Sequence, residues 1–274
     1  MDLVYILVLL VTGALVGLVS GMLGVGGCFI MIPVQYWILT AMGIDMSIAI
    51  RVAFGTNLLV VFPTALSGSL RHHKKSAVLW KQAVILGLTS VAFTFAGAWV
   101  ASNLPGDILK IIFGLAILLG ALRMATAHPI RVEGEPHANP ATYIFLGAVF
   151  GFVTGLIGIG GGVLMVPLMV IFLNYHMHEA VATSTAVMVF TSLGGAIAYM
   201  LYGLGAHGLP PYSIGYVNLL QWVLLAGTSI PMAQVGAHVA HKIHPHGLKW
   251  IFIIVMAYMG LKMVGIFSWL SLPI

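Results

Sequence analysis

The chain has 274 residues, of which 61% are hydrophobic and only 6% are charged, and its mean hydropathy is +1.10. A soluble domain carries about a quarter charged residues. This composition therefore excludes a water-soluble globular protein and predicts a multi-pass protein of the cell membrane, surrounded by the lipid bilayer. The net charge of +5 comes from basic residues gathered in short segments such as 71–75. That pattern is typical of membrane topology and argues against nucleic acid as a partner.

Hydrophobic stretches follow one another along the chain, four in each half. A spanning helix needs about 20 apolar residues, and the opening stretch of each half is too long for one crossing and is interrupted by glycines. We therefore predict an all-α polytopic membrane protein of about ten membrane segments, in which each opening stretch folds as a glycine-broken hairpin. The stretches cover residues 3–41, 46–70, 80–102, 107–124, 141–173, 178–203, 216–240 and 248–269.

The opening stretches of the two halves have similar sequences. Residues 14–33 read ALVGLVSGMLGVGGCFIMIP, and residues 148–167 read AVFGFVTGLIGIGGGVLMVP. Every glycine of the first segment is matched by a glycine of the second, and so is the closing proline. Such a match indicates a duplicated unit.

Two further pairs of segments match in the same order, which argues against chance similarity between apolar helices. The chain is therefore predicted to contain a first transmembrane repeat at 1–125, a linker at 126–140 and a second transmembrane repeat at 141–274. The further matching segments are 53–57 with 180–184, and 97–113 with 236–252.

The distribution of basic residues favours the hairpin model. If each opening stretch crossed once, the Lys and Arg residues would divide seven against four across the membrane. If each folds back, eight lie on one side and only Arg51, Lys110 and Lys262 on the other. Basic residues concentrate in cytoplasmic loops, so the hairpin model is preferred. Five segments in each half then make the two repeats inverted, a common plan in transporters.

The duplicated glycine clusters are the first candidate site. Clustered glycines interrupt a helix because they destabilise it and accept positive φ. The N–H groups that open the next half-helix, together with its dipole, form an anion site. The alternative is that these glycines only allow close helix packing. The candidate residues are Gly24, Gly26, Gly27, Gly158, Gly160, Gly161 and Gly162.

Polar residues in apolar surroundings are the second set of candidates. Gln35 could line the substrate path, or bond a neighbouring helix. Arg51 could attract an anion, or extend to the membrane interface as long basic side chains do. Hydroxyl and amide groups at matching positions could bind the oxygens of an anion, or bond carbonyls of their own helix. These last residues are Thr56, Asn57, Thr183 and Ser184.

Four histidines near the end of the chain raise the alternative of a metal-dependent membrane protein or enzyme. They are His238, His241, His244 and His246. Because no cysteine or carboxylate lies near them, we predict no metal site and no cofactor. The hydrophobic stretches contain no grouping of nucleophile, base and acid, so we predict that the protein is not an enzyme. An accessory subunit of a larger complex stays open as a further alternative.

Together these motifs resemble the TauE/SafE sulfite exporter family. The resemblance rests on the two glycine clusters followed by Pro33 and Pro167, on the segments 53–57 and 180–184, and on the matching blocks that close each half. It implies a secondary transporter that exports small sulfur-containing anions such as sulfite, sulfoacetate or other organosulfonates, driven by the proton-motive force. We expect alternating access and a small anionic substrate, and we leave a homodimer open.

Two residues depart from the repeated pattern. Cys28 stands where the second glycine cluster has Gly162, and Asn57 stands where the second half has Ser184. Both differences predict a site that is not symmetric between the two halves.

Overall fold

The computed structural model describes residues 3–23, 27–74, 76–126, 139–160, 162–239 and 245–266. Within these residues the chain forms ten α-helices and one small β-hairpin. The helices are α1 (Leu3–Leu23), α2 (Cys28–Ala41), α3 (Met46–Lys74), α4 (Trp80–Asn103), α5 (Gly106–Thr126), α6 (Pro140–Ile157), α7 (Gly162–Leu173), α8 (Met177–Tyr202), α9 (Leu219–Val239) and α10 (Pro245–Val264). The strands β1 (Ser213–Ile214) and β2 (Val217–Asn218) pair antiparallel before α9 begins.

The helices have the length and composition of membrane segments. Five of them are long and apolar enough to cross a bilayer, namely α3, α4, α5, α6 and most of α8. Shorter apolar stretches occur in α1, α2, α9 and α10. The prediction of a polytopic, all-helical membrane protein is therefore confirmed.

One face of α1 is built for contact with lipid. Leu3, Leu7, Val11 and Leu15 recur every four residues and are each more than half exposed. Residues spaced by four lie on one side of a helix, and so these side chains form an apolar stripe on the surface. Leu9, on another side of the same helix, is completely buried.

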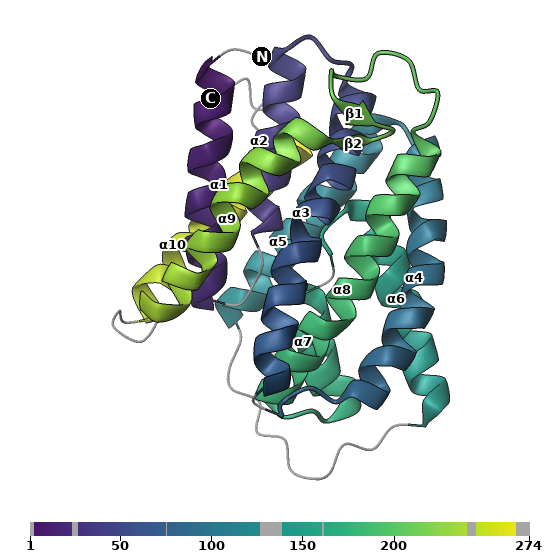
Figure 1. Cartoon of the computed structure of the whole chain (residues 1–274), viewed down its shortest axis with the longest axis vertical. Coiled ribbons are helices and arrows are strands. Elements are labelled where there is room, and N and C mark those ends of the chain that lie inside the picture. Colours follow the sequence, from purple (N-terminus) through teal and green to yellow (C-terminus); the bar gives the residue numbers. More distant parts are fainter. Residues whose placement is uncertain are drawn as a thin grey trace.

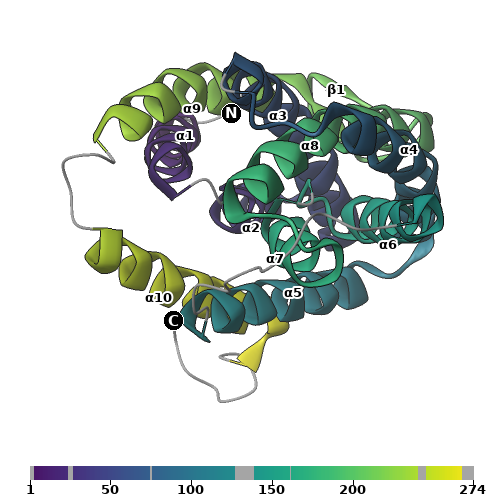
Figure 2. The ribbon, with the colours of Figure 1, turned by 90° about the horizontal axis from the view of Figure 1, so that it is seen from below.

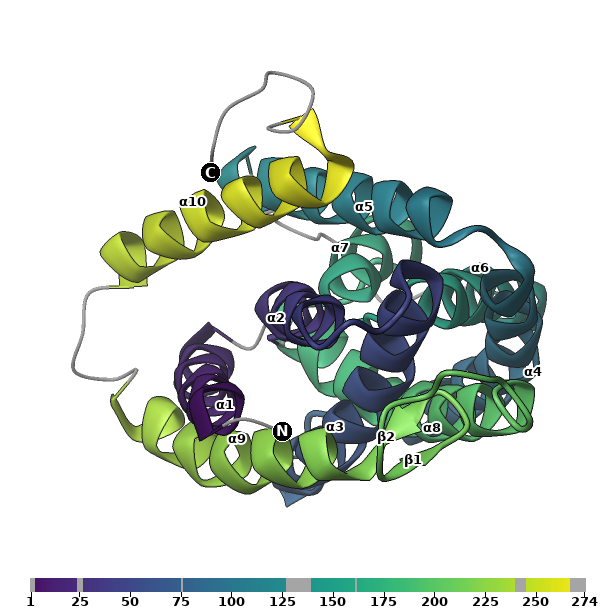
Figure 3. The ribbon, with the colours of Figure 1, turned by 90° about the horizontal axis from the view of Figure 1, so that it is seen from above.

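Successive helices run in alternating directions (Figure 1). The long opening stretch of each half is divided by its glycines into two helices, α1 with α2 and α6 with α7. Seen along the bundle, α2, α3, α7 and α8 lie toward the centre, and the other helices form peripheral pairs, α1 with α9, α4 with α6 and α5 with α10 (Figures 2 and 3).

Glycines hold α4 and α6 in close contact. A Cβ atom added to Gly151 would collide with the Ser90 carbonyl, and one added to Gly155 would collide with that of Thr94. The side chains of these two α4 residues add hydrogen bonds, from Ser90 Oγ to the Gly147 carbonyl at 2.9 Å and from Thr94 Oγ1 to the Gly151 carbonyl at 3.0 Å. Small residues that let backbones approach are typical of helix association in membranes.

The α1–α9 pair uses the sequence-matched residues in the same way. An added Cβ on Gly13 would lie 2.9 Å from the Leu225 carbonyl oxygen, and one on Gly17 would collide with Ser229. By the alignment of the two halves, Gly13 and Gly17 correspond to Gly147 and Gly151. The two pairs are therefore built alike, each from the first helix of one half and the fourth helix of the other.

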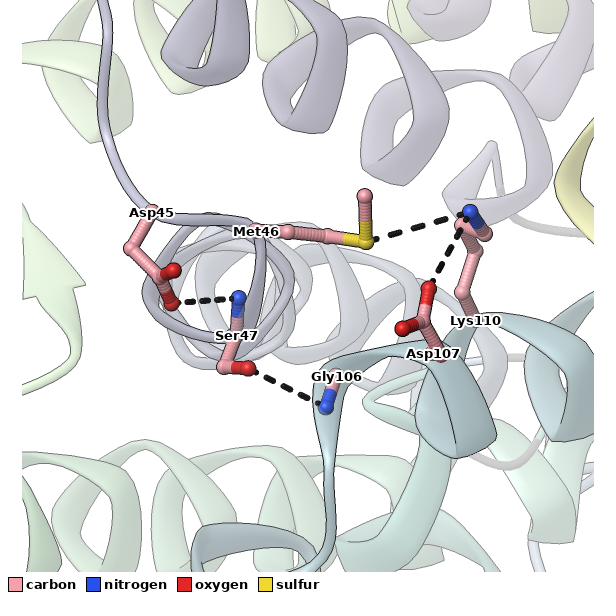
Figure 4. Close-up of polar contacts among 6 residues, drawn as sticks. All are labelled: Asp45, Met46, Ser47, Gly106, Asp107 and Lys110. Carbon is pink, nitrogen blue, oxygen red and sulfur yellow. Dashed lines mark hydrogen bonds and ion pairs between the residues drawn. The ribbon is translucent and has the colours of Figure 1, made fainter.

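A polar cluster joins the starts of α3 and α5 at one end of the bundle (Figure 4). Asp45 Oδ1 accepts a hydrogen bond from the Ser47 N–H at 2.8 Å, which caps the start of α3. Ser47 Oγ accepts one from the Gly106 N–H at 3.2 Å. Lys110 lies 3.6 Å from an Asp107 oxygen and 3.9 Å from the Met46 sulfur. The cluster therefore fixes α3 against α5 at this end.

Candidate functional site

The second glycine cluster forms a sharp break between α6 and α7. Gly158 ends α6 with φ of 66°, and Gly160 has φ of 78°. These left-handed conformations are ones that glycine adopts at little cost. Gly162 begins α7. The sequence prediction of a helix break at this cluster agrees with the geometry, while Gly161 lies outside the described residues.

The first glycine cluster lies between α1 and α2. Gly27 is the N-cap residue of α2, and Gly24 and Gly26 lie outside the described residues. A Cβ atom on Gly27 would collide with the side chain of Val16 on α1, so glycine lets α1 pass close to the start of α2. No side chain caps this helix start with a hydrogen bond.

The structure brings the two breaks together. Asn57 Nδ2 donates a hydrogen bond to the Gly158 carbonyl at 2.7 Å, and Cys28 Sγ donates one to the Ile159 carbonyl at 2.9 Å. Thr191 Oγ1 lies 3.4 Å from the Gly160 carbonyl oxygen. Backbone carbonyls freed at a membrane helix break need such partners. The two residues that depart from the repeat pattern are thus the ones that bind the second break.

A cavity of about 210 Å³ lies beside the start of α2. It is bounded by α1, the start of α2, α3, α8 and α9, and it extends to the last turn of α3. Its apolar wall includes Val16, Met31 and Val61. Its other lining residues include a set that could contact an anion, namely Ser20, Gly27, Cys28, Thr64, Ser67, Arg71, His72, Thr185, Ser229 and Gln234.

Three features make this cavity suitable for an anion. The N-terminus of α2, at Gly27 and Cys28, lies in its wall and carries the positive end of the helix dipole. Ser229 is 1% exposed, and its hydroxyl has no hydrogen-bond partner. Arg71 stands where the cavity reaches the end of α3. The cavity therefore offers backbone N–H groups, a hydroxyl donor and a positive charge.

An apolar cluster closes the cavity toward the other end of the bundle. Leu9, Met31, Val60 and Leu225 are all buried within it. A second, smaller cavity of about 60 Å³ lies beyond, between the end of α2, the β-hairpin and the start of α9. The larger cavity is therefore separated from that end of the bundle by packed side chains.

Gln35 is completely buried on α2, and neither its Nε2 nor its Oε1 has a hydrogen-bond partner. It lies one helical turn beyond Met31, which lines the cavity. Asn57 Oδ1 on α3 and Gln221 Oε1 on α9 are also buried without partners. Burying an unpartnered polar group costs about 1–3 kcal/mol, so these atoms mark the interior around α2 as a place for a polar ligand or water.

Thr56 and Thr183 bind the backbone at the starts of two helices. Thr56 Oγ1 accepts a hydrogen bond from the Asn218 N–H at 2.9 Å, just before α9, and Thr183 Oγ1 accepts one from the Leu79 N–H at 3.2 Å, just before α4. These bonds occupy matching positions in the two halves. The two hydroxyls therefore bind backbone N–H groups at opposite ends of the bundle. Their role as substrate ligands stays a prediction.

Neither Arg51 nor Ser184 is among the residues that line the cavity. The Arg51 guanidinium donates to the Ala101 and Leu104 carbonyls at 3.2 and 2.9 Å, and its Cζ lies 5.6 Å from the centre of the Tyr216 ring. It thus binds the carbonyl end of α4, where the helix dipole favours a cation. Ser184 Oγ donates to the Val181 carbonyl of its own helix at 3.0 Å.

Sequence reasoning missed Ser229 and Arg71 as candidate site residues. Ser229 aligns with Ser90 of the first half, so the duplication itself was the available signal. The histidine cluster at 238–246 lies outside the residues whose side chains the structure describes. Among the described residues, no three His, Cys, Asp or Glu side chains gather as metal ligands would.

Residues 9–263 match the model of the family described as "Sulfite exporter TauE/SafE". A "probable membrane transporter protein" of Methanocaldococcus jannaschii is 31% identical over 257 residues, which cover 93% of this chain and 94% of that protein. One of Bacillus subtilis is 29% identical, over 95% of this chain and 98% of its own length.

A third similar protein, a "probable membrane transporter protein" of Haemophilus influenzae, is 25% identical over 92% of this chain and 97% of its own length. No solved structure matches the chain. The matched family and these relatives are membrane transporters and not enzymes. The chain therefore belongs to the sulfite exporter TauE/SafE family of multi-pass membrane transporters.

Proposed function

We propose that the protein is a secondary transporter that exports small sulfur-containing anions, such as sulfite, sulfoacetate or another organosulfonate, across the cytoplasmic membrane. Alternating access, driven by the proton-motive force, moves the anion. The observation that carries this proposal is the cavity at the start of α2. Its lining includes the N-terminus of α2, which no side chain caps, the Ser229 hydroxyl and Arg71. An oxyanion is bound by such donors.

The size of the cavity supports a small substrate. Sites for drug-sized ligands measure about 300–1,000 Å³, and this cavity measures about 210 Å³. An anion of a few heavy atoms with some of its water fits that space. The sulfur-containing class is taken from the description of the family.

The arrangement of the halves supports alternating access. Each half contributes five helices and successive helices alternate in direction (Figure 1), which supports the prediction that the halves are inverted repeats. The bonds of Thr56 and Thr183 to the starts of α9 and α4 occur at matched positions. Inverted repeats enclosing a central site are the common plan of transporters that open alternately to either side.

The cavity opens toward the cytoplasm. The last turn of α3, which the cavity reaches, carries Arg71, His72, His73 and Lys74, and the last turn of α5 carries Arg123. Basic residues concentrate on the cytoplasmic side. An exporter loads its substrate from that side.

Transport in proteoliposomes tests the proposal. Vesicles loaded with sulfite, sulfoacetate or thiosulfate should lose one of these anions when a pH gradient is imposed, and protein-free vesicles should not. Ser229→Ala and Arg71→Gln should each lower the rate of transport several-fold, because each removes a donor from the cavity.

Matched controls separate a local effect from general damage. Arg123→Gln removes the same charge at the same end of the bundle, and Ser102→Ala removes a hydroxyl that bonds only the Ala98 carbonyl of its own helix. Neither residue lines the cavity, so both should transport as the parent protein does. If the cavity variants and their controls lose activity equally, the site is misassigned. If no sulfur anion moves at all, the substrate class is wrong.

A further inference from the structure

The two peripheral pairs sit differently on the central helices. α4 packs more extensively on α8 than α9 packs on α3. A Cβ atom added to Gly195 of α8 would lie 3.0 Å from Thr94 Cγ2 of α4. At the matched position on α3, an added Cβ on Gly68 would meet, among the described residues, only Thr185 within 4 Å and no atom of α9. The α4–α6 pair is therefore closed on α8, whereas α9 contacts α3 near its start and leaves a space beside Gly68.

The space left beside α3 is the cavity described above. The match between the two halves identifies the corresponding place in the other half, beside α8. Cavity residues on α1, α3 and α9 correspond one by one to residues on α6, α8 and α4. The counterparts of Ser20, Thr64, Ser229 and Ala233 are Thr154, Thr191, Ser90 and Thr94. These four residues carry hydroxyls, and all four are buried at the packed junction of α4, α6 and α8.

Thr154 is the unsatisfied member of this group. It is 1% exposed, and its hydroxyl has no hydrogen-bond partner. A threonine hydroxyl inside a helix can bond a carbonyl of the preceding turn, but Thr154 does not make this bond. Ser90 and Thr94, by contrast, donate to the Gly147 and Gly151 carbonyls of α6. The junction therefore holds one hydroxyl without a partner, that of Thr154. The hydroxyls of Ser90 and Thr94 join α4 to α6, and neither of these two bonds involves α8.

We propose that Ser90, Thr94, Thr154 and Thr191 form a second anion-binding site, which is closed in this structure. It opens to the opposite side of the membrane when the α4–α6 pair moves away from α8, while α1–α9 closes on α3. This inference rests on the proposed function, because its ligand is the same small oxyanion, held there by hydroxyl groups.

The second site differs from the first in charge. Arg71 and His72 of the open cavity correspond to Ala198 and Tyr199, and Gln234 corresponds to Phe95. Tyr199 donates its hydroxyl to the Gly155 carbonyl at 2.8 Å. Without a cation at these positions, the second site holds an anion less tightly, which suits the side on which an exporter releases it.

A reversible disulfide tests the movement. The Cβ of Val91 on α4 lies 3.5 Å from the position of a Cβ on Gly194 of α8, within the range for disulfides. Oxidation of the Val91→Cys, Gly194→Cys double variant should lock the α4–α6 pair shut and abolish transport, and reduction should restore it. Each single variant, treated with the same oxidant, is the control.

A second readout does not depend on knowing the substrate. In Thr154→Cys, a membrane-impermeant maleimide applied from the side of the β-hairpin should label the introduced thiol at a measurable rate, read by mass spectrometry of the peptide. The disulfide should reduce this labelling at least tenfold. The proposal of a second site would be wrong if the disulfide left the rate of labelling unchanged. It would also be wrong if protein that transports the anion were not labelled at all. Labelling without transport of any sulfur anion would refute the substrate class alone.

Discussion

Asn57 and Cys28 are two residues at which the matched segments of the halves differ in chemistry. Both occupy positions where the second half has a smaller residue, and both donate to carbonyls of the second glycine break. Ser184, the counterpart of Asn57, bonds its own helix instead. The asymmetry predicted from the sequence thus corresponds to two specific bonds between α2, α3 and the α6–α7 break, which hold that break against the centre of the bundle.

Replacement of Gly158 tests the geometry of this break. Gly158→Ala should lower the free energy of unfolding by about 2 kcal/mol or more, because a left-handed φ costs a residue with a Cβ about 1–2 kcal/mol and because the added Cβ would lie 2.7 Å from Phe54 Cα. Thermal unfolding of the purified protein in detergent measures the loss.

Gly43→Ala is the matched control for that change. Gly43 also has a positive φ, of 80°, but nothing lies within 4 Å of its added Cβ. It should therefore show only the cost of the backbone conformation. Equal losses for the two variants would mean that the contact with Phe54 adds nothing.

At the level of single elements, the helices could be predicted closely and the directions of their side chains could not. The apolar stretches 80–102 and 107–124 correspond to α4 and α5 within a few residues, because runs of apolar residues ending at polar or glycine positions define a membrane helix. In lipid, however, both the buried and the exposed faces are apolar. The helical periodicity that reveals an inward face in soluble proteins is therefore weak here.

Two features of the structure could therefore not be predicted from the sequence. The predicted repeat pairs Thr56 with Thr183, but their binding of backbone N–H groups before α9 and α4 depends on contacts far away in sequence. The β-hairpin at 213–218 was not predicted, since strands of two residues carry too little pattern to be recognised.

The glycine contacts between α4 and α6 allow a test at the same scale. Gly151→Ala should destabilise the protein by about 2 kcal/mol or more, because its Cβ would collide with the backbone of Ser90, and overpacking in a rigid contact costs about 1–3 kcal/mol. The temperature of unfolding, followed by tryptophan fluorescence, should fall.

Gly227→Ala makes the same change within α9, where nothing lies within 4 Å of the added Cβ. Alanine is favoured over glycine inside a helix by about 1 kcal/mol, so this variant should unfold at the same or a higher temperature. A fall as large as that of Gly151→Ala would show that the effect does not arise from the α4–α6 contact.

For the whole molecule, the sequence predicts a duplication, and the structure adds how the two halves differ. The matched segments 97–113 and 236–252 gave the register that relates α4 to α9. In the proposed transport cycle, which of the two peripheral pairs stands open depends on the state that the bundle occupies, and both states share one sequence. The position of the cavity therefore could not be predicted from residues alone.

The difference in charge between the two proposed sites predicts different affinities on the two sides of the membrane. The KM for the transported anion should be lower, by about fivefold, at the side of Arg71 than at the side of the β-hairpin, since an exposed charge contributes up to about 1 kcal/mol. Inside-out and right-side-out vesicles measure the two values. In Arg71→Gln the values should converge, and an unchanged ratio would contradict the assignment.

In the proposed transport cycle, the bonds of Thr56 and Thr183 would set the point about which each peripheral pair rotates. α9 is fastened to α3 where it begins, at Asn218, and the cavity lies near its other end, at Ala233 and Gln234. A helix of this length spans about 30 Å, so a rotation of about 10° around the fastened end would shift the far end by about 5 Å. α4 is fastened where it begins, by the Leu79 N–H, and Figure 1 shows the start of α4 at the opposite end of the bundle from the start of α9. In the proposed cycle, the two pairs would therefore rotate about points at opposite ends of the bundle, and a small rotation of either pair would make room for an anion.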